Sequence, residues 1–157
     1  MITITLEEVT KDKMKKVQEI VLSNKIYNVL ENGRETRSMK EMKEEFLNPA
    51  TYSYFIKADQ DYIGLIDYLP ENPKDHYPWL GLLMVHEQWK GKGFGKRAYH
   101  LFEESIKNSG KQAIRLGVLT DNKDAKVFWE SLGFIYYETK PFKEGREVDC
   151  YEKKLKK

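Results

Sequence analysis

The sequence predicts one α+β domain, residues 1–157, with a mixed, mostly antiparallel seven-stranded sheet and about four helices. Three observations predict this fold class. Alternating polar and apolar residues form paired strands in both halves of the chain. A continuous apolar run, WLGLLMV (79–85), is typical of a strand that is buried on both faces. A glycine-rich turn, an amphipathic helix and another strand follow this run, so the centre of the chain is a β-α-β unit.

Composition fits a soluble globular domain: 40% of the residues are hydrophobic and 33% are charged. The net charge of +2 is too small to indicate a nucleic-acid partner. Cys150, the single cysteine, excludes an intramolecular disulfide and offers no metal cluster, and its alternating neighbours place it in a strand. The N-terminus lacks the features of a signal peptide, and no apolar run is long enough to span a membrane. We therefore expect a cytoplasmic protein without a metal, membrane or nucleic-acid partner.

The first part of the chain predicts one strand and two helices. Residues 2–8 (ITITLEE) alternate as a strand does. Thr10 is a suitable N-cap for a helix whose apolar residues recur at helical spacing. Ser38 and Glu41 form a capping box, which predicts the start of a second helix. The segment between these helices, 31–38 (ENGRETRS), reads as a polar loop.

The rest of the chain predicts six strands and two helices. The strands are expected at 51–58, 62–69, 79–85, 113–119, 134–142 and 147–155. One helix begins near Phe94 and ends at the NSG sequence of 108–110. Asp121 or Asn122 can cap the other helix, which Gly133 ends.

The segment KGKGFGKR, 90–97, predicts an anion-binding site. The first turn of a helix leaves about four N–H groups without partners, and the helix dipole adds roughly half a positive charge there. Gly91, Gly93 and Gly95 remove Cβ atoms where a ligand would sit, and the neighbouring cations add positive potential. A phosphate or pyrophosphate ligand is the direct inference.

Two common phosphate motifs do not match this segment. A P-loop needs four residues between its glycines, whereas Gly91 and Gly95 enclose three, and Arg97 stands where Ser or Thr is required. A dinucleotide fingerprint needs a glycine at the position of Lys96 and a mostly parallel sheet. Taken alone, the glycines also fit an ordinary turn with solvated lysines.

Two segments together resemble the GNAT N-acetyltransferase superfamily. The segment LMVHEQWKGKGFGKRAY resembles the family's acetyl-CoA-binding segment, and LGVLTDNKDAKVFWESLGF resembles its later motif. The resemblance covers Leu80 to Phe134 and has two departures. Lys90 replaces the usual Gln or Arg, and Glu87 stands where a proline is frequent. The resemblance implies a GNAT-like fold whose central β-α-β unit is splayed.

The resemblance also implies acetyl-CoA as the cofactor and assigns residues to it. Backbone groups of Leu83, Met84 and Val85 would contact the pantetheine arm. Asn122, Ala125 and Phe128 would line the outer part of this arm. Amides of the glycine segment would bind the pyrophosphate; these are Lys90, Gly91, Lys92, Gly93, Phe94, Gly95 and Lys96.

The implied chemistry is direct attack of a primary amine on the thioester. It requires a neutral amine, an oxyanion donor and an acid for the departing thiolate. The family's frequent acid is a Tyr where this chain has Trp129, and an indole N–H is not an acid for this purpose. Asp67, in an otherwise apolar strand, is the candidate base; an exposed strand end or a nearby cation would explain it equally well. His86 is a second candidate base, although a loop-capping histidine is commoner.

These residues leave three functions open. The first is an N-acetyltransferase that acts on a small-molecule or peptide amine. The second is a regulatory or pseudo-enzymatic module that binds acyl-CoA without turnover, since the acid Tyr is missing. The third, an RNA- or phosphopeptide-binding domain, is disfavoured by the near-neutral charge and by the absence of a stacking motif. The resemblance implies that the first helices and last strands select the acceptor, and that a homodimer is possible.

Overall fold

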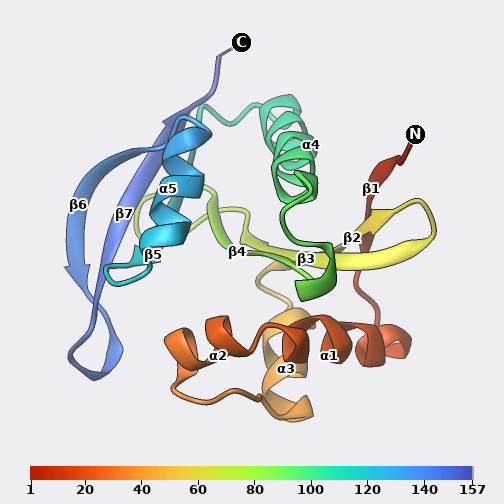
Figure 1. Ribbon diagram of the computed structural model, residues 1–157. Coiled ribbons are helices and arrows are strands. Elements are labelled where there is room, and N and C mark those ends of the chain that lie inside the picture. The colour runs from red at the N-terminus through yellow and green to blue at the C-terminus, as the bar shows by residue number, and fades with distance from the viewer. Residues whose placement is uncertain (157) are drawn as a thin grey trace.

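The computed structural model describes residues 1–156, which form a seven-stranded sheet and five α-helices (Figure 1). The strands are β1 (Ile4–Glu8), β2 (Tyr52–Ala58), β3 (Asp61–Leu69), β4 (Trp79–Val85), β5 (Ala113–Leu119), β6 (Ile135–Pro141) and β7 (Glu147–Lys154). The helices are α1 (Met14–Ser23), α2 (Lys25–Asn32), α3 (Met39–Phe46), α4 (Phe94–Asn108) and α5 (Lys123–Ser131). Among residues 1–156, none of the helices has the length and apolar character needed to span a bilayer.

The strand order is β1-β2-β3-β4-β5-β7-β6, and only β4 and β5 pair in parallel. The predicted mixed, mostly antiparallel sheet is therefore confirmed. Within the described residues, the parallel pair meets at one position, where Trp79 lies opposite Arg115. Beyond this position β4 and β5 are no longer paired and they diverge, as the resemblance implied (Figure 1).

Two apolar cores lie on the two faces of the sheet. Helices α1, α2 and α3 lie together below the sheet in Figure 1, and α1 and α3 pack on one face through residues such as Val17, Met42 and Phe46. Helices α4 and α5 cover the other face, where Tyr99 and Phe102 are almost fully buried. The divergent ends of β4 and β5 lie between these two layers.

A β-bulge in β4 turns its last residues relative to its first. Asp67 and Tyr68 on β3 pair with Leu82 and Leu80, so the register skips Gly81. Leu80 consequently packs in the α4–α5 core, whereas Leu82 packs in the α1–α3 core. An extra residue in one strand disrupts the ladder locally and bends that strand. The bulge thus adds to the separation of β4 from β5.

Helix α2 is the main departure from the sequence prediction, which gave about four helices; the predicted polar loop at 31–38 is present from 33 to 38, and its first two residues belong to α2. Its burial pattern is the reverse of that of a usual amphipathic helix, because the apolar Ile26 and Val29 are exposed whereas the polar Asn28 is fully buried. The Asn28 amide donates to the carbonyls of Val21 and Glu35, which ties α2 to the segments on either side. Side-chain hydrogen bonds, rather than an apolar stripe, therefore fix this helix.

Candidate active site

The glycine turn leads from the end of β4 into α4. Gly91 and Gly93 have φ angles of 78° and 81°, in the left-handed region that favours glycine. An added Cβ at either position would meet nothing within 4 Å, so both glycines face open space. Gly93 is the N-cap of α4 and offers no side-chain acceptor. The first-turn amides of α4 are therefore available to a ligand, as the sequence predicted.

A cavity of about 670 Å³ opens in front of this turn, between β4, β5, α4 and α5. Its lining contains most of the residues that the sequence assigned to the cofactor: Leu83, Val85, Lys90, Gly91, Gly93, Phe94, Gly95, Lys96, Asn122, Ala125 and Phe128. The Cβ of an alanine at Gly95 would lie 3.5 Å from side-chain atoms of both Leu83 and Val85. This is an ordinary van der Waals distance, so Gly95 lies directly against β4, and a long side chain at this position would extend into the cavity.

Two of the assigned residues point elsewhere. The Met84 side chain is buried in the α1–α3 core, which leaves only its backbone on the cavity side of β4. The Lys92 ammonium lies 5.9 Å from the centre of the Trp89 ring.

Of the neighbouring cations, Lys90 pairs with Glu87 at 2.9 Å, and Arg97 donates to the carbonyl of Ile2. Because the side chains of Lys90, Lys92 and Arg97 have partners within the protein, the backbone amides of the glycine turn are the main candidate ligands for an anion.

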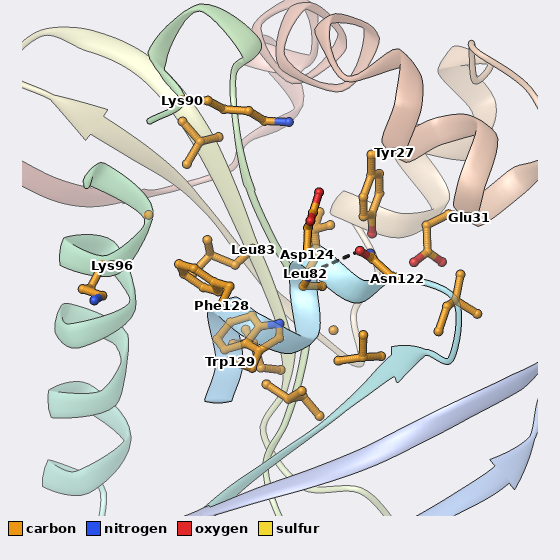
Figure 2. Close-up of a pocket in the computed structure, with 18 of the residues that line it drawn as sticks. Tyr27, Glu31, Leu82, Leu83, Lys90, Lys96, Asn122, Asp124, Phe128 and Trp129 are labelled. Atoms are coloured by element: carbon orange, nitrogen blue, oxygen red, sulfur yellow. Dashed lines mark hydrogen bonds between the residues drawn. The ribbon is translucent and has the colours of Figure 1, made fainter. Parts of the chain in front are cut away.

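The sequence did not identify the residues that close the other end of the cavity. Tyr27 and Glu31 of α2 line it, and so does Asp124 at the start of α5. Figure 2 shows Tyr27 and Glu31 on the side opposite Lys96 and the α4 helix. The sequence prediction missed them because it did not contain α2. The family resemblance pointed only to the first helices as the region that selects the acceptor.

Asp67 is buried, but it does not line the cavity. It lies on the same face of β3 as Leu65, toward the α1–α3 core, and the Ser53 hydroxyl donates to its carboxylate at 2.9 Å. The pKa of Asp67 is raised to about 6, mainly by burial and also by the nearby Glu45 carboxylate, while the hydrogen bond from Ser53 and the nearby Thr51 hydroxyl act in the opposite direction. The group is therefore poised to titrate near neutral pH, at a position separate from the cavity lining.

His86 has the structural role that was the alternative to a catalytic one. Its Nδ1 accepts from the backbone N–H of Gln88 at 3.1 Å and so caps the short helical turn at Glu87–Trp89. His76 is exposed and lies 3.5 Å from Glu71. Neither histidine lines the cavity among the described residues.

Trp129 joins the cavity lining to the α4–α5 core, and it is 8% exposed. Its ring packs edge-on against Tyr99 and Phe134, with centroid separations of 5.7 and 5.4 Å. The residue therefore gives this wall an apolar aromatic surface in place of a titratable hydroxyl.

Asn122 serves both a helix and the cavity. Its side-chain oxygen accepts from the Ala125 backbone N–H at 3.1 Å, the dashed contact in Figure 2, and so caps α5. The sequence named Asp121 or Asn122 for this cap, and the structure identifies Asn122. Within residues 1–156 no hydrogen bond involves its amide NH₂ group, which can therefore donate into the cavity.

Comparison with known proteins agrees with this geometry. Residues 17–134 match the model of the "Acetyltransferase (GNAT) family". Over 117 residues, the chain is 26% identical to an uncharacterised N-acetyltransferase of Lactobacillus delbrueckii subsp. lactis, and this match covers 70% of this chain and 68% of that protein.

Two solved structures illustrate the similarity of fold. An acetyltransferase from Thermus thermophilus aligns with a TM-score of 0.84 and 22% identity, over 98% of this chain and 97% of that one. A spermidine N-acetyltransferase from Vibrio cholerae, solved with CoA and spermine, aligns with a TM-score of 0.76 and 16% identity, over 96% of this chain and 95% of that one.

Proposed function

Because this chain belongs to the GNAT acetyltransferase family, we propose that it transfers an acetyl group from acetyl-CoA to a primary amine by direct attack. The observation that carries this proposal is the cavity between β4 and β5, which joins the glycine turn to α2. Such a cavity has room for the arm of CoA from one end and for an amine from the other. The V. cholerae neighbour is named for acting on spermidine, so alkylamines are a reasonable first class of acceptor to test.

The residues present fit acetyl-CoA. The glycine turn has space where Cβ atoms would otherwise block a pyrophosphate, and the amides from Lys90 to Lys96 would hold it at the N-terminus of α4. Backbone groups of Leu83, Met84 and Val85 would hold the pantetheine arm, since β4 lacks a parallel partner there. Asn122, Ala125 and Phe128 would cover this arm from α5. When bound, acetyl-CoA supplies the activated acetyl group.

The protein's part in the reaction is to position the amine, keep it neutral and stabilise the developing negative charge. An alkyl ammonium with a pKa of about 10 must first lose its proton. Asp67 stays our candidate for this base, acting through water, because its pKa of about 6 suits proton transfer near neutral pH. We expect Asp67→Asn to lower turnover more than CoA affinity. An unchanged pH–rate profile in this variant would rule out the role.

Trp129 favours one alternative function. Because an indole cannot protonate the departing thiolate, a module that binds acyl-CoA without turnover is the second candidate. The homodimer and the small-molecule or peptide nature of the acceptor also stay predictions.

One experiment separates the two functions. The purified protein is mixed with acetyl-CoA and a panel of primary amines, and free CoA thiol is measured together with the acetylated amine. We expect thiol release that depends on the amine and matches the acetylated product. CoA binding without thiol release against any amine would support the binding module instead.

A further inference from the structure

The two ends of the cavity carry opposite charges. Lys90, which is paired with Glu87, and Lys96 line the cavity at the glycine turn, whereas Glu31 lines it beside α2, and Asp124 lies between these two sides (Figure 2). The cationic end suits the phosphates of CoA. The acidic end lies beside α2, where an acceptor would enter. The cavity is therefore arranged for an anion at one end and a cation at the other.

Asp124 has a structural explanation. It is exposed and lies in the first turn of α5, where a carboxylate stabilises the helix dipole. Glu31 has no such explanation, because it lies in the last turn of α2, where a negative charge is unfavourable. Its presence at the cavity wall calls for another reason.

The Glu31 carboxylate has no cationic partner within the described part of the protein. The nearby arginines bond elsewhere: Arg34 pairs with Glu41, and Arg37 pairs with Glu45 at 2.7 Å. Arg146, from the turn between β6 and β7, donates to the backbone carbonyls of Leu30 and Glu31 rather than to the carboxylate. Among residues 1–156, no ion pair includes Glu31, although its side chain is half-buried. Arg146, Lys143 and Arg37 are near enough to favour the charged form of Glu31, but none of them forms an ion pair with it, so the direct partner of this half-buried carboxylate is left for a ligand to supply.

We propose that Glu31 binds a second positive charge on the acceptor, and hence that the acceptor is a cationic amine such as an alkyl diamine. This inference rests on the proposed acetyltransferase function and adds the substrate class. The amine that attacks must be neutral, so the cation at Glu31 is a different group of the same molecule. Tyr27, one helical turn before Glu31, provides a neutral polar neighbour for the chain that joins the two groups. The second charge can belong to a free diamine or to a peptide with two basic side chains.

The test compares substrates that differ in one charge. Diaminobutane and pentylamine have the same number of heavy atoms, and a methyl group of pentylamine replaces the second ammonium. We expect the wild-type protein to show a higher kcat/KM for diaminobutane, by about tenfold or more, which corresponds to one charge-assisted hydrogen bond. A second arm uses a capped peptide with two adjacent lysines and its analogue with norleucine in place of one lysine. The arm that shows the preference identifies the source of the cation.

Glu31→Gln keeps the size of the side chain and removes its charge. Since Arg146 contacts the backbone carbonyl of Glu31, this variant keeps the end of α2 in place. We expect the advantage of diaminobutane to disappear through a higher KM for this substrate, so that the two amines react with similar kcat/KM, while CoA affinity stays as in the wild type. Glu44→Gln, on the exposed face of α3, is the matched control and should change neither substrate.

The preference should also depend on pH. Burial raises the pKa of Glu31, against the influence of Arg146 and Lys143 from the β6–β7 turn and of Arg37, while Glu45 raises it further. Protonation at low pH removes the charge, so the ratio of kcat/KM for diaminobutane to that for pentylamine should fall as the pH is lowered. The ratio cancels the loss of neutral amine that affects both substrates.

Several results would overturn the inference. In one, the wild type does not distinguish diaminobutane or the dilysine peptide from the analogue that has one cationic group fewer; in another, Glu31→Gln slows both members of each pair equally. In both cases acetyl transfer itself would stand. The absence of thiol release with every amine would instead refute the proposed function, and this inference with it.

Discussion

Asp67 is a carboxyl group that the fold buries beside a hydroxyl and without an ion-pair partner among the described residues. A raised pKa means that the native state binds the proton more tightly than the unfolded chain does. Between about pH 4 and pH 6 the native state therefore holds more protons, and the free energy of unfolding falls as the pH rises through this window. The residue weakens the fold at neutral pH, which is a common property of groups kept for function.

We predict that Asp67→Asn stabilises the protein near neutral pH by about 3 kcal/mol, because the variant removes the cost of ionising a buried carboxyl group whose pKa is raised from 3.8 to about 6. The amide oxygen can still accept from Ser53, and the amide NH₂ can donate to the Thr51 hydroxyl, which has no other hydrogen-bond partner among the described residues. Urea unfolding at about pH 7 and about pH 4 would measure the effect, which should vanish at the lower pH. A variant that is less stable at both pH values would contradict this account.

At the scale of elements, the site depends on a bulge in β4, on the start of α5 and on the end of α2. The bulge at Gly81 and the single contact between β4 and β5 open the cavity. The capping contact of Asn122 fixes the first turn of α5 against the cavity. Arg146 holds the last carbonyls of α2 from the turn between β6 and β7. The Asn122 and Arg146 contacts lie at helix ends, whereas the bulge lies within β4 between two core residues, Leu80 and Leu82.

Asn122 allows its two roles to be separated. Asp caps a helix about as well as Asn, but it replaces the free NH₂ donor with a negative charge. We predict that Asn122→Asp unfolds like the wild type in urea and binds CoA more weakly. Asn122→Ala should lose about 1 kcal/mol of stability as well, because the cap is gone. If Asn122→Asp binds CoA like the wild type, Asn122 is only a cap.

At the scale of the whole molecule, local signals decided what could be predicted. The alternating strands, the capping box at Ser38 and the glycine turn each depend on residues close in sequence, and all three appear in the structure. Helix α2 does not follow this rule. Asn24, just before the helix, donates to the distant carbonyl of Val85, and Asn28 is buried through hydrogen bonds to carbonyls outside the helix, while Ile26 is exposed. A pattern of hydrophobicity cannot show such bonds.

The candidate site divides in the same way. The end at the glycine turn could be predicted, since its residues are nearly consecutive and match a motif. Glu31 could not, because it reaches the cavity only through the packing of α2 and its tie to Arg146, more than a hundred residues later. Asp67 was assigned from the apolar strand around it, but the face of β3 on which it lies depends on the three-dimensional register.

The central claim is that the cavity in front of the glycine turn binds CoA. The most direct measurement is a calorimetric titration of CoA into the wild type, into Gly95→Glu and into His100→Glu. Gly95 faces Leu83 and Val85 on the cavity wall, so a glutamate there would occupy the space and repel the pyrophosphate. His100 is exposed on α4 outside the cavity and controls for the added charge on the same helix. We predict binding by the wild type and His100→Glu, and no measurable binding by a folded Gly95→Glu. Equal CoA affinity in all three proteins, or no binding by the wild type, would contradict the claim.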